Sequence, residues 1–133
     1  MAGEQAMIAA GVGSRRDVSA EEIERVVRLA LETFRIPAAS VDVLATEAGK
    51  SGTAAYVEAA QRLAVPLLGV SSARLGEVAD RVITPSARAL ATKGVPSIAE
   101  AAALCAAGAK ARLLGARVAT ARATCAIAIG NAS

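Results

Sequence analysis

Residues 7–23 have the sequence MIAAGVGSRRDVSAEEI. The apolar run at residues 7–12 precedes two glycines, two arginines and an amphipathic segment, which predicts a strand, a glycine turn and a helix in that order. Glycine lets a backbone approach a ligand closely, and the start of a helix exposes unpaired N–H groups. Because Arg15 and Arg16 add fixed positive charge, this segment predicts a site for an anion.

The first helix is predicted from Ser19 to Phe34. Apolar residues recur there at helical spacing, and Ser19 with Glu22 has the pattern of a capping box. Further elements are then predicted as a strand at residues 41–46, a helix at residues 53–63 and a strand at residues 65–70. This order predicts an α/β fold, a single three-layer α/β/α domain over residues 1–133 with a mostly parallel or mixed sheet.

The second predicted helix places its apolar residues on one face, at Ala54, Val57, Ala60 and Leu63. A short helix capped by Ser71 or Ser72 is expected next, followed by an irregular or weakly helical stretch at residues 84–94.

A further helix is predicted near the end of the chain, between Ser97 and Gly108. Ser97 is expected to cap this helix with Glu100 at its third position, and capping accounts for both residues. The remaining apolar segments, residues 111–120 and 124–129, predict a final hairpin.

Ligands of such sheets gather at the carboxyl ends of the strands. The glycine turn and the loop at residues 47–52 follow successive strands, so we expect them to meet at one site. Glu47 is expected to orient Lys50 or to act as a general base. The predicted ligand-binding residues are Gly11, Gly13, Ser14, Arg15, Arg16, Thr46, Lys50 and Ser51.

The composition argues against several classes of function. The chain has one Phe, one Tyr and no Trp, and its net charge of +3 is spread along the sequence, so nucleic-acid binding is not expected. The third glycine of a dinucleotide-binding motif would fall at Arg16, and there is no P-loop. With no histidine, a serine-hydrolase triad is excluded. An acidic small molecule is the ligand class that best suits the small excess of positive charge.

The two cysteines, Cys105 and Cys125, lie far apart in apolar surroundings and are expected to be free core residues. No metal site and no cofactor are predicted. The N-terminus lacks a basic leader region, and no apolar run is long enough to cross a bilayer, so a cytoplasmic protein without membrane contact is expected.

Three segments together resemble a known family. They are the GVGSRR turn at residues 11–16 before Ser19, the Ala45-Thr46 strand end followed by Lys50, and GVPSIAEAAAL at residues 94–104. In this order they resemble the cobalamin biosynthesis family formed by CobE and the C-terminal domain of CbiG. The resemblance covers residues 7–129.

The resemblance implies a role in making the corrin ring of vitamin B12, whose tetrapyrrole intermediates carry many acetate and propionate carboxylates. Arginine donates a bidentate fork to carboxylate and lysine supplies a mobile charge, so Arg15, Arg16 and Lys50 would suit such a ligand. The expected function is binding of a carboxylate-rich tetrapyrrole, of the precorrin or hydrogenobyrinic acid type, as a carrier. The backbone at Gly11 and Gly13 could hold one more carboxylate. Other enzymes of the pathway are possible partners.

Two alternatives stay open. The first is an enzyme acting on a precorrin, such as a lactone hydrolase as in CbiG, with Lys50 or Glu47 carrying acid–base chemistry. CbiG has further N-terminal sequence that this chain lacks, so its activity is not carried over. The second is a scaffold that meets partner enzymes through an alanine-rich surface.

The chain departs from the family pattern at two positions. Ser14 stands where family members often carry Cys, which removes thiol chemistry from the loop. Asp17 stands where they often carry Gly, and its carboxylate is expected to cap the helix and to compete with an anionic ligand.

Overall fold

The structure is a computed structural model that describes residues 6–84 and 97–131. Most of the stretch predicted to be irregular, residues 84–94, lies outside these ranges. The elements are, in order, β1 (Ala6–Ser14), α1 (Ala20–Thr33), η1 (Ala38–Ser40), β2 (Val43–Glu47), α2 (Ala48–Ser51), α3 (Ala54–Leu63), β3 (Leu67–Val70), α4 (Ser72–Glu77), η2 (Ala79–Arg81), α6 (Ile98–Ala107), β4 (Arg112–Leu113), β5 (Val118–Ala119) and β6 (Ala123–Asn131).

The sheet has six strands in the order β3-β2-β1-β6-β4, with β5 also paired to β6. Strands β1, β2 and β3 are parallel, whereas β6 runs antiparallel to β1 along its whole length. Both β4 and β5 pair antiparallel with β6, so the predicted hairpin is present in two short pieces. The sheet is therefore mixed, in agreement with the predicted fold class.

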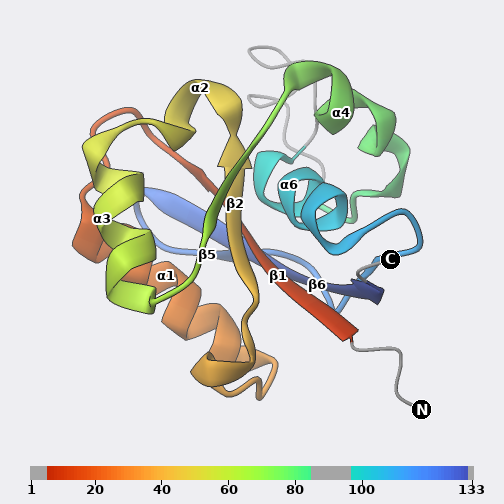
Figure 1. The fold of residues 1–133 in the computed structure, drawn as a ribbon, viewed down its shortest axis with the longest axis horizontal. Coiled ribbons are helices and arrows are strands. Elements are labelled where there is room, and N and C mark those ends of the chain that lie inside the picture. The colour runs from red at the N-terminus through yellow and green to blue at the C-terminus, as the bar shows by residue number, and fades with distance from the viewer. Residues whose placement is uncertain (1–5, 85–96, 132–133) are drawn as a thin grey trace.

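Helices cover both faces of the sheet, with α1 and α3 on one side and α4 and α6 on the other (Figure 1). The core under α1 and α3 contains large side chains such as Ile23, Leu44 and Ile127. The core under α6 is built from alanines, including Ala103 and Ala126. Small side chains let α6 lie close to the sheet, which completes a three-layer α/β/α arrangement.

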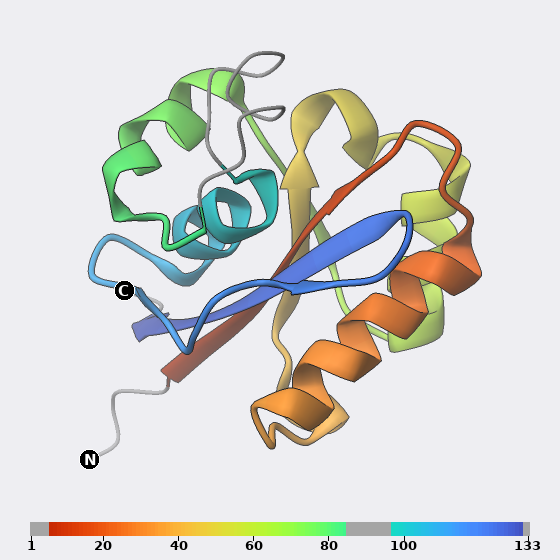
Figure 2. The ribbon, with the colours of Figure 1, turned by 180° about the vertical axis from the view of Figure 1, so that it is seen from behind.

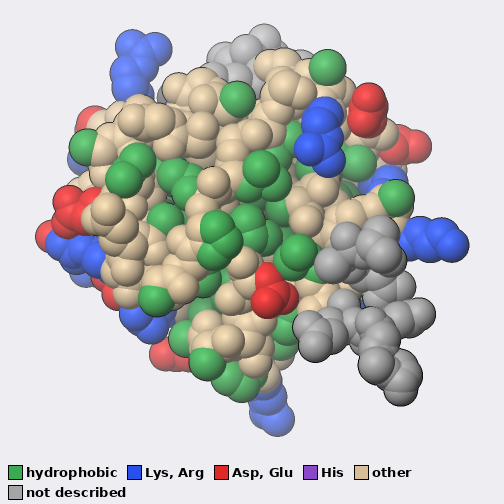
Figure 3. All heavy atoms as spheres, viewed as in Figure 1, with side chains coloured by type: hydrophobic (Ala, Val, Ile, Leu, Met, Phe, Trp, Pro, Cys, Tyr) green, Lys and Arg blue, Asp and Glu red, His purple; other side chains and the backbone are tan. Residues whose placement is uncertain are grey.

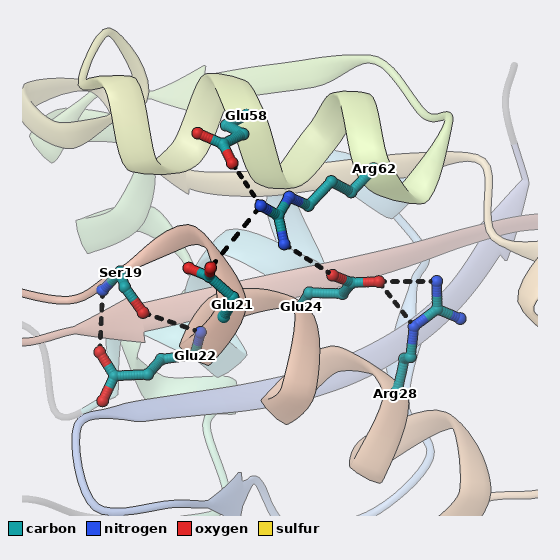
Figure 4. Close-up of polar contacts among 7 residues, drawn as sticks. All are labelled: Ser19, Glu21, Glu22, Glu24, Arg28, Glu58 and Arg62. Carbon is teal, nitrogen blue, oxygen red and sulfur yellow. Dashed lines mark hydrogen bonds and ion pairs between the residues drawn. The ribbon is translucent and has the colours of Figure 1, made fainter.

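Helix α1 begins as predicted, with a complete capping box between Ser19 and Glu22. The acidic residues on its exposed side face α3, where Arg62 lies within 3.7 Å of Glu21 and 3.6 Å of Glu24 (Figure 4). Arg62 also pairs with Glu58 on its own helix at 2.6 Å. Such exposed pairs contribute little each, about 0–1 kcal/mol. They hold these carboxylates along the α1–α3 surface.

The predicted apolar face of α3 is partly wrong. Val57 is 41% exposed, whereas Tyr56, Ala59 and Ala60 are buried. Tyr56 is the largest side chain in the helix, and turning it inwards buries more apolar surface than burying Val57 would. It also brings the Tyr56 hydroxyl to the end of β1.

The predicted glycine turn is wrong, because β1 continues through Gly11 and Gly13 to Ser14. A Cβ at Gly11 would overlap the carbonyl oxygen of Ala99 and lie 2.5 Å from the nitrogen of Ala103. Gly11 is therefore the point at which the backbone of α6 crosses the strand. Its lack of a side chain serves helix–sheet packing, not the approach of a ligand.

Capping is an incomplete explanation of Glu100. Its backbone N–H does donate to the Ser97 hydroxyl at 3.3 Å, but its fully buried carboxylate reaches other segments. One oxygen accepts hydrogen bonds from the N–H groups of Ile83 (2.7 Å) and Thr84 (2.9 Å), and the other accepts from the N–H of Arg117 at 2.9 Å. Glu100 thus ties α6 to two connecting segments of the chain.

Both cysteines are free thiols, as expected. Cys125 is fully buried in β6, and burial raises its pKa strongly. Cys105 is partly exposed on α6, where its Sγ lies 3.2 Å from the carbonyl oxygen of Arg74. Within the described part of the chain, no helix combines the length and the apolar character needed to cross a membrane.

Candidate functional site

The ends of several strands meet at one edge of the sheet, which we call the carboxyl edge. It comprises residues 14–19, residues 46–51 and residues 120–124, because β1 and β2 end there and the antiparallel β6 begins there. Seen from behind, the β1–α1 loop lies beside the turn that leads into β6 (Figure 2). The predicted loop after β1 therefore has as its neighbour a turn, at residues 120–122, that the sequence did not place at the site.

Lys50 and Ser14 come together at this edge as predicted. The one-turn helix α2 follows β2 directly and carries Lys50, whose ammonium group donates to the carbonyl oxygen of Ser14. On the other side, the Ser14 hydroxyl shares a hydrogen bond of 2.7 Å with the hydroxyl of Tyr56. These contacts hold the last residue of β1 between α2 and α3.

The hydroxyls of Thr46 and Ser51 both donate hydrogen bonds to backbone carbonyl oxygens of the protein. Thr46 is fully buried, and its Oγ1 donates to the carbonyl oxygen of Val12 at 2.7 Å. Ser51 Oγ donates to the carbonyl oxygen of Ala48 at 3.1 Å, within its own helical turn. In this structure Thr46 therefore joins β2 to β1, and Ser51 stabilises the turn that carries Lys50.

Arg15 and Arg16 lie in the exposed loop just after β1. Their side chains make no hydrogen bond or ion pair with any residue that the structure describes. The backbone N–H of Arg15 donates to the carbonyl oxygen of Arg122 at 2.9 Å, which ties the loop to the turn before β6. The loop is thus anchored through its backbone while two guanidinium groups remain available to solvent.

The prediction that Asp17 caps α1 is wrong. The Asp17 carboxylate accepts a hydrogen bond from the guanidinium of Arg122, and the cap of α1 is supplied by Ser19. This hydrogen bond lowers the pKa of Asp17 below its usual value, so Asp17 is ionised at neutral pH. Glu22 also faces Arg122, with 3.4 Å between Oε2 and Nε.

The buried tyrosine limits the chemistry of this edge. Burial raises the pKa of Tyr56, although its hydrogen bond with Ser14 opposes that shift, so the phenol stays protonated at neutral pH. Ser14 therefore has no deprotonated partner at Tyr56, and the chain contains no histidine. The arrangement presents positive charge and hydrogen-bond donors, which suits binding of anionic groups.

Tyr56 and Arg122 were both missed from the sequence. In the helix that contains Tyr56, the spacing of apolar residues predicted that Val57 would be buried. A single Tyr among alanines could have indicated that Tyr56 is buried instead. Arg122 lies far from Arg15 in the chain and reaches it only because β6 pairs antiparallel with β1. No local pattern indicates that pairing.

Gly11 does not reach the carboxyl edge, since α6 covers it. Gly13 lies nearer to the carboxyl edge. It packs against the start of α6, where a Cβ added to Gly13 would lie 3.3 Å from the Cβ of Ile98. On the face seen in Figure 3, hydrophobic side chains gather towards the middle and Lys and Arg side chains project around the outline. The basic side chains on this face are thus spread around its outline and do not gather in one patch.

The fold and this edge define an α/β protein with exposed arginines at the end of a central strand. The chain matches the family described as Cobalamin synthesis G C-terminus over residues 8–128. It is 32% identical over 118 residues to Protein CobE from Sinorhizobium sp, covering 89% of this chain and 77% of that protein. The chain belongs to this family and is a protein of cobalamin biosynthesis, as its resemblance predicted.

Solved structures agree with this assignment. A crystal structure of CobE, a protein from the cobalamin (vitamin B12) biosynthetic pathway, matches with a TM-score of 0.88 at 36% identity over 93% of both chains. The cobalamin biosynthesis protein chiG from Agrobacterium tumefaciens str. C58 matches with a TM-score of 0.74 at 38% identity, over 96% of this chain and 100% of that one.

Proposed function

We propose that this protein binds a carboxylate-rich tetrapyrrole of cobalamin biosynthesis, of the precorrin or hydrogenobyrinic acid type, at the carboxyl edge. The observation that carries the proposal is the pair of exposed guanidinium groups, Arg15 and Arg16, on a loop anchored by its backbone. Each can form a bidentate, charge-assisted pair with a carboxylate. A corrin precursor offers several carboxylates around one ring, so more than one can be bound at once.

We further propose that the protein carries this ligand without changing it, passing it between enzymes of the pathway. Lys50 donates to the Ser14 carbonyl and Tyr56 is held as a protonated phenol, so these groups support the loop. A carrier needs accessible charge and reversible binding. Exposed arginines supply both, because exposed ionic contacts form and break at low cost.

The test is an absorbance titration of the protein with hydrogenobyrinic acid, followed by mass spectrometry of the recovered ligand. The wild-type protein should bind saturably, and Arg15→Ala/Arg16→Ala should bind about tenfold more weakly. An exposed ionic contact contributes about 0–1 kcal/mol, and tenfold corresponds to about 1.4 kcal/mol, which is the scale expected for losing two of them. Affinity should also fall as NaCl is raised, because the Debye length is only about 8 Å at physiological ionic strength.

The matched control is Lys110→Ala/Arg112→Ala, which also removes two exposed cations. Arg112 pairs with Ile129, and Ile129 pairs with Ile8, near the opposite end of β1 from Ser14. Ile8 and Ser14 are six positions apart in the strand, which corresponds to about 20 Å. Equal weakening by both double variants, or no binding at all, contradicts the proposal. A new product mass at catalytic amounts of protein would replace the carrier with an enzyme acting on a precorrin.

A further inference from the structure

A third arginine lies at the carboxyl edge, and the structure shows it paired with carboxylates of the protein itself. Arg122 immediately precedes β6, and its carbonyl oxygen accepts the hydrogen bond from the Arg15 N–H. This contact extends the β1–β6 pairing one residue beyond Ser14 and Ala123. Residues paired in this way have Cβ atoms roughly 5 Å apart, so Arg15 and Arg122 bring two positive charges to one place.

Two carboxylates offset this positive charge. Asp17 accepts a hydrogen bond from the Arg122 guanidinium, and Glu22 approaches its Nε. Glu22 is also committed to the cap of α1, where its Oε1 accepts from the Ser19 N–H at 2.8 Å. Besides Arg122, Asp17 interacts with its own backbone N–H and with the charge of Arg15, which lies in the same loop. Neither contact caps a helix, so Asp17 is the carboxylate that can leave.

The Asp17–Arg122 pair is open to exchange. The Asp17 side chain is 68% exposed and that of Arg122 is 44% exposed, so water replaces either partner at little cost. A ligand already held at Arg15 and Arg16 would present its next carboxylate to Arg122 at a high effective concentration. An intramolecular pair of this kind is displaced by a multivalent anion more readily than by a single carboxylate.

We propose that Arg122 is a third arginine of the tetrapyrrole site. In the free protein Arg122 is paired with Asp17, and a carboxylate of the ligand replaces Asp17 when the ligand binds. This inference rests on the proposed function. It specifies a ligand with carboxylates at two separated positions, one set on Arg15 and Arg16 and another on Arg122. Asp17 then acts as an internal competitor that limits affinity and lets the ligand be released.

The test is a double-mutant cycle in the same hydrogenobyrinic acid titration. Asp17→Asn should tighten binding about two- to fivefold, the range expected for removing one exposed ion pair. Arg122→Ala should weaken binding by a similar factor. In the Arg122→Ala background, Asp17→Asn should lose most of its effect. Asp80→Asn removes an exposed carboxylate from η2, which contacts the turn that follows α6, and should leave affinity unchanged.

Two results would overturn the inference. If Asp17→Asn tightens binding equally with and without Arg122, Asp17 acts by simple repulsion and Arg122 is not part of the site. If Arg122→Ala binds as the wild type does, Arg122 does not touch the ligand. Either result leaves the proposed function standing, provided that binding still depends on Arg15 and Arg16. Absence of wild-type binding would remove both.

The placement of the ligand carboxylates gives an independent check. Protoporphyrin carries its propionates side by side at one edge of the ring, whereas uroporphyrin carries carboxylates around the whole ring. Arg122→Ala should weaken the binding of uroporphyrin more than that of protoporphyrin, because only uroporphyrin can fill both positions at once. Equal weakening of the two would contradict the two-position arrangement.

Discussion

Gly11→Ala is expected to destabilise the protein by about 3 kcal/mol or more, the upper part of the range for overpacking a tight core. The added Cβ would meet the backbone of α6 at Ala99 and Ala103, and neither atom belongs to a flexible side chain. Helix α6 would have to move away from β1 and open the alanine core beneath it. Thermal or urea unfolding followed by circular dichroism measures the effect.

The matched control is the same substitution at Gly76 in α4, where a Cβ would meet nothing within 4 Å. Gly76→Ala should be neutral or stabilising by roughly 0.5–1 kcal/mol, because alanine lowers the entropy of the unfolded chain and favours helix. An unchanged midpoint for Gly11→Ala would mean that α6 does not sit directly on Gly11.

Glu100→Ala is expected to cost about 3 kcal/mol or more. Three backbone N–H groups, those of Ile83, Thr84 and Arg117, would lose a charged acceptor, and an unsatisfied buried donor costs about 1–3 kcal/mol. For a domain of this size, such a loss lowers Tm by roughly 10 °C. Glu100→Gln keeps one acceptor oxygen and should recover part of the loss.

Glu77→Gln serves as the control for Glu100, since it makes the same neutral substitution at an exposed position of α4. It should leave Tm nearly unchanged, because exposed substitutions usually change stability by less than about 0.5 kcal/mol. Hydrogen exchange gives a local readout, in which the amides of Ile83, Thr84 and Arg117 should lose protection in Glu100→Gln. Unchanged protection at these amides would show that Glu100 does not hold them.

Local patterns predicted the elements whose causes are local. The α1 capping box depends on residues three apart, and Ser19 and Glu22 satisfy it in the structure. Gly108 ends α6 with φ of 118°, a conformation that favours glycine. The alternation of strands and helices was likewise enough for the three-layer arrangement, because each amphipathic helix needs a sheet face to cover it.

Features that depend on distant partners could not be obtained in this way. The two glycines of β1 have the composition of a turn, but α6, far along the chain, requires small residues there. The Asp17–Arg122 pair depends on β6 lying next to β1. At the candidate site, sequence therefore placed Ser14, Lys50 and the arginines at one edge. It did not predict Tyr56 or Arg122.

The most direct test of the tetrapyrrole site is an NMR titration of the 15N-labelled protein with hydrogenobyrinic acid. We expect saturable shifts that are largest for amides of the carboxyl edge, at Arg15, Arg16, Lys50 and Arg122. Amides at the opposite end of β1, near Ile8 and Arg112, should stay in place. Shifts concentrated at that opposite end or on the exposed faces of α1 and α3, or no shifts at saturating ligand, would contradict it.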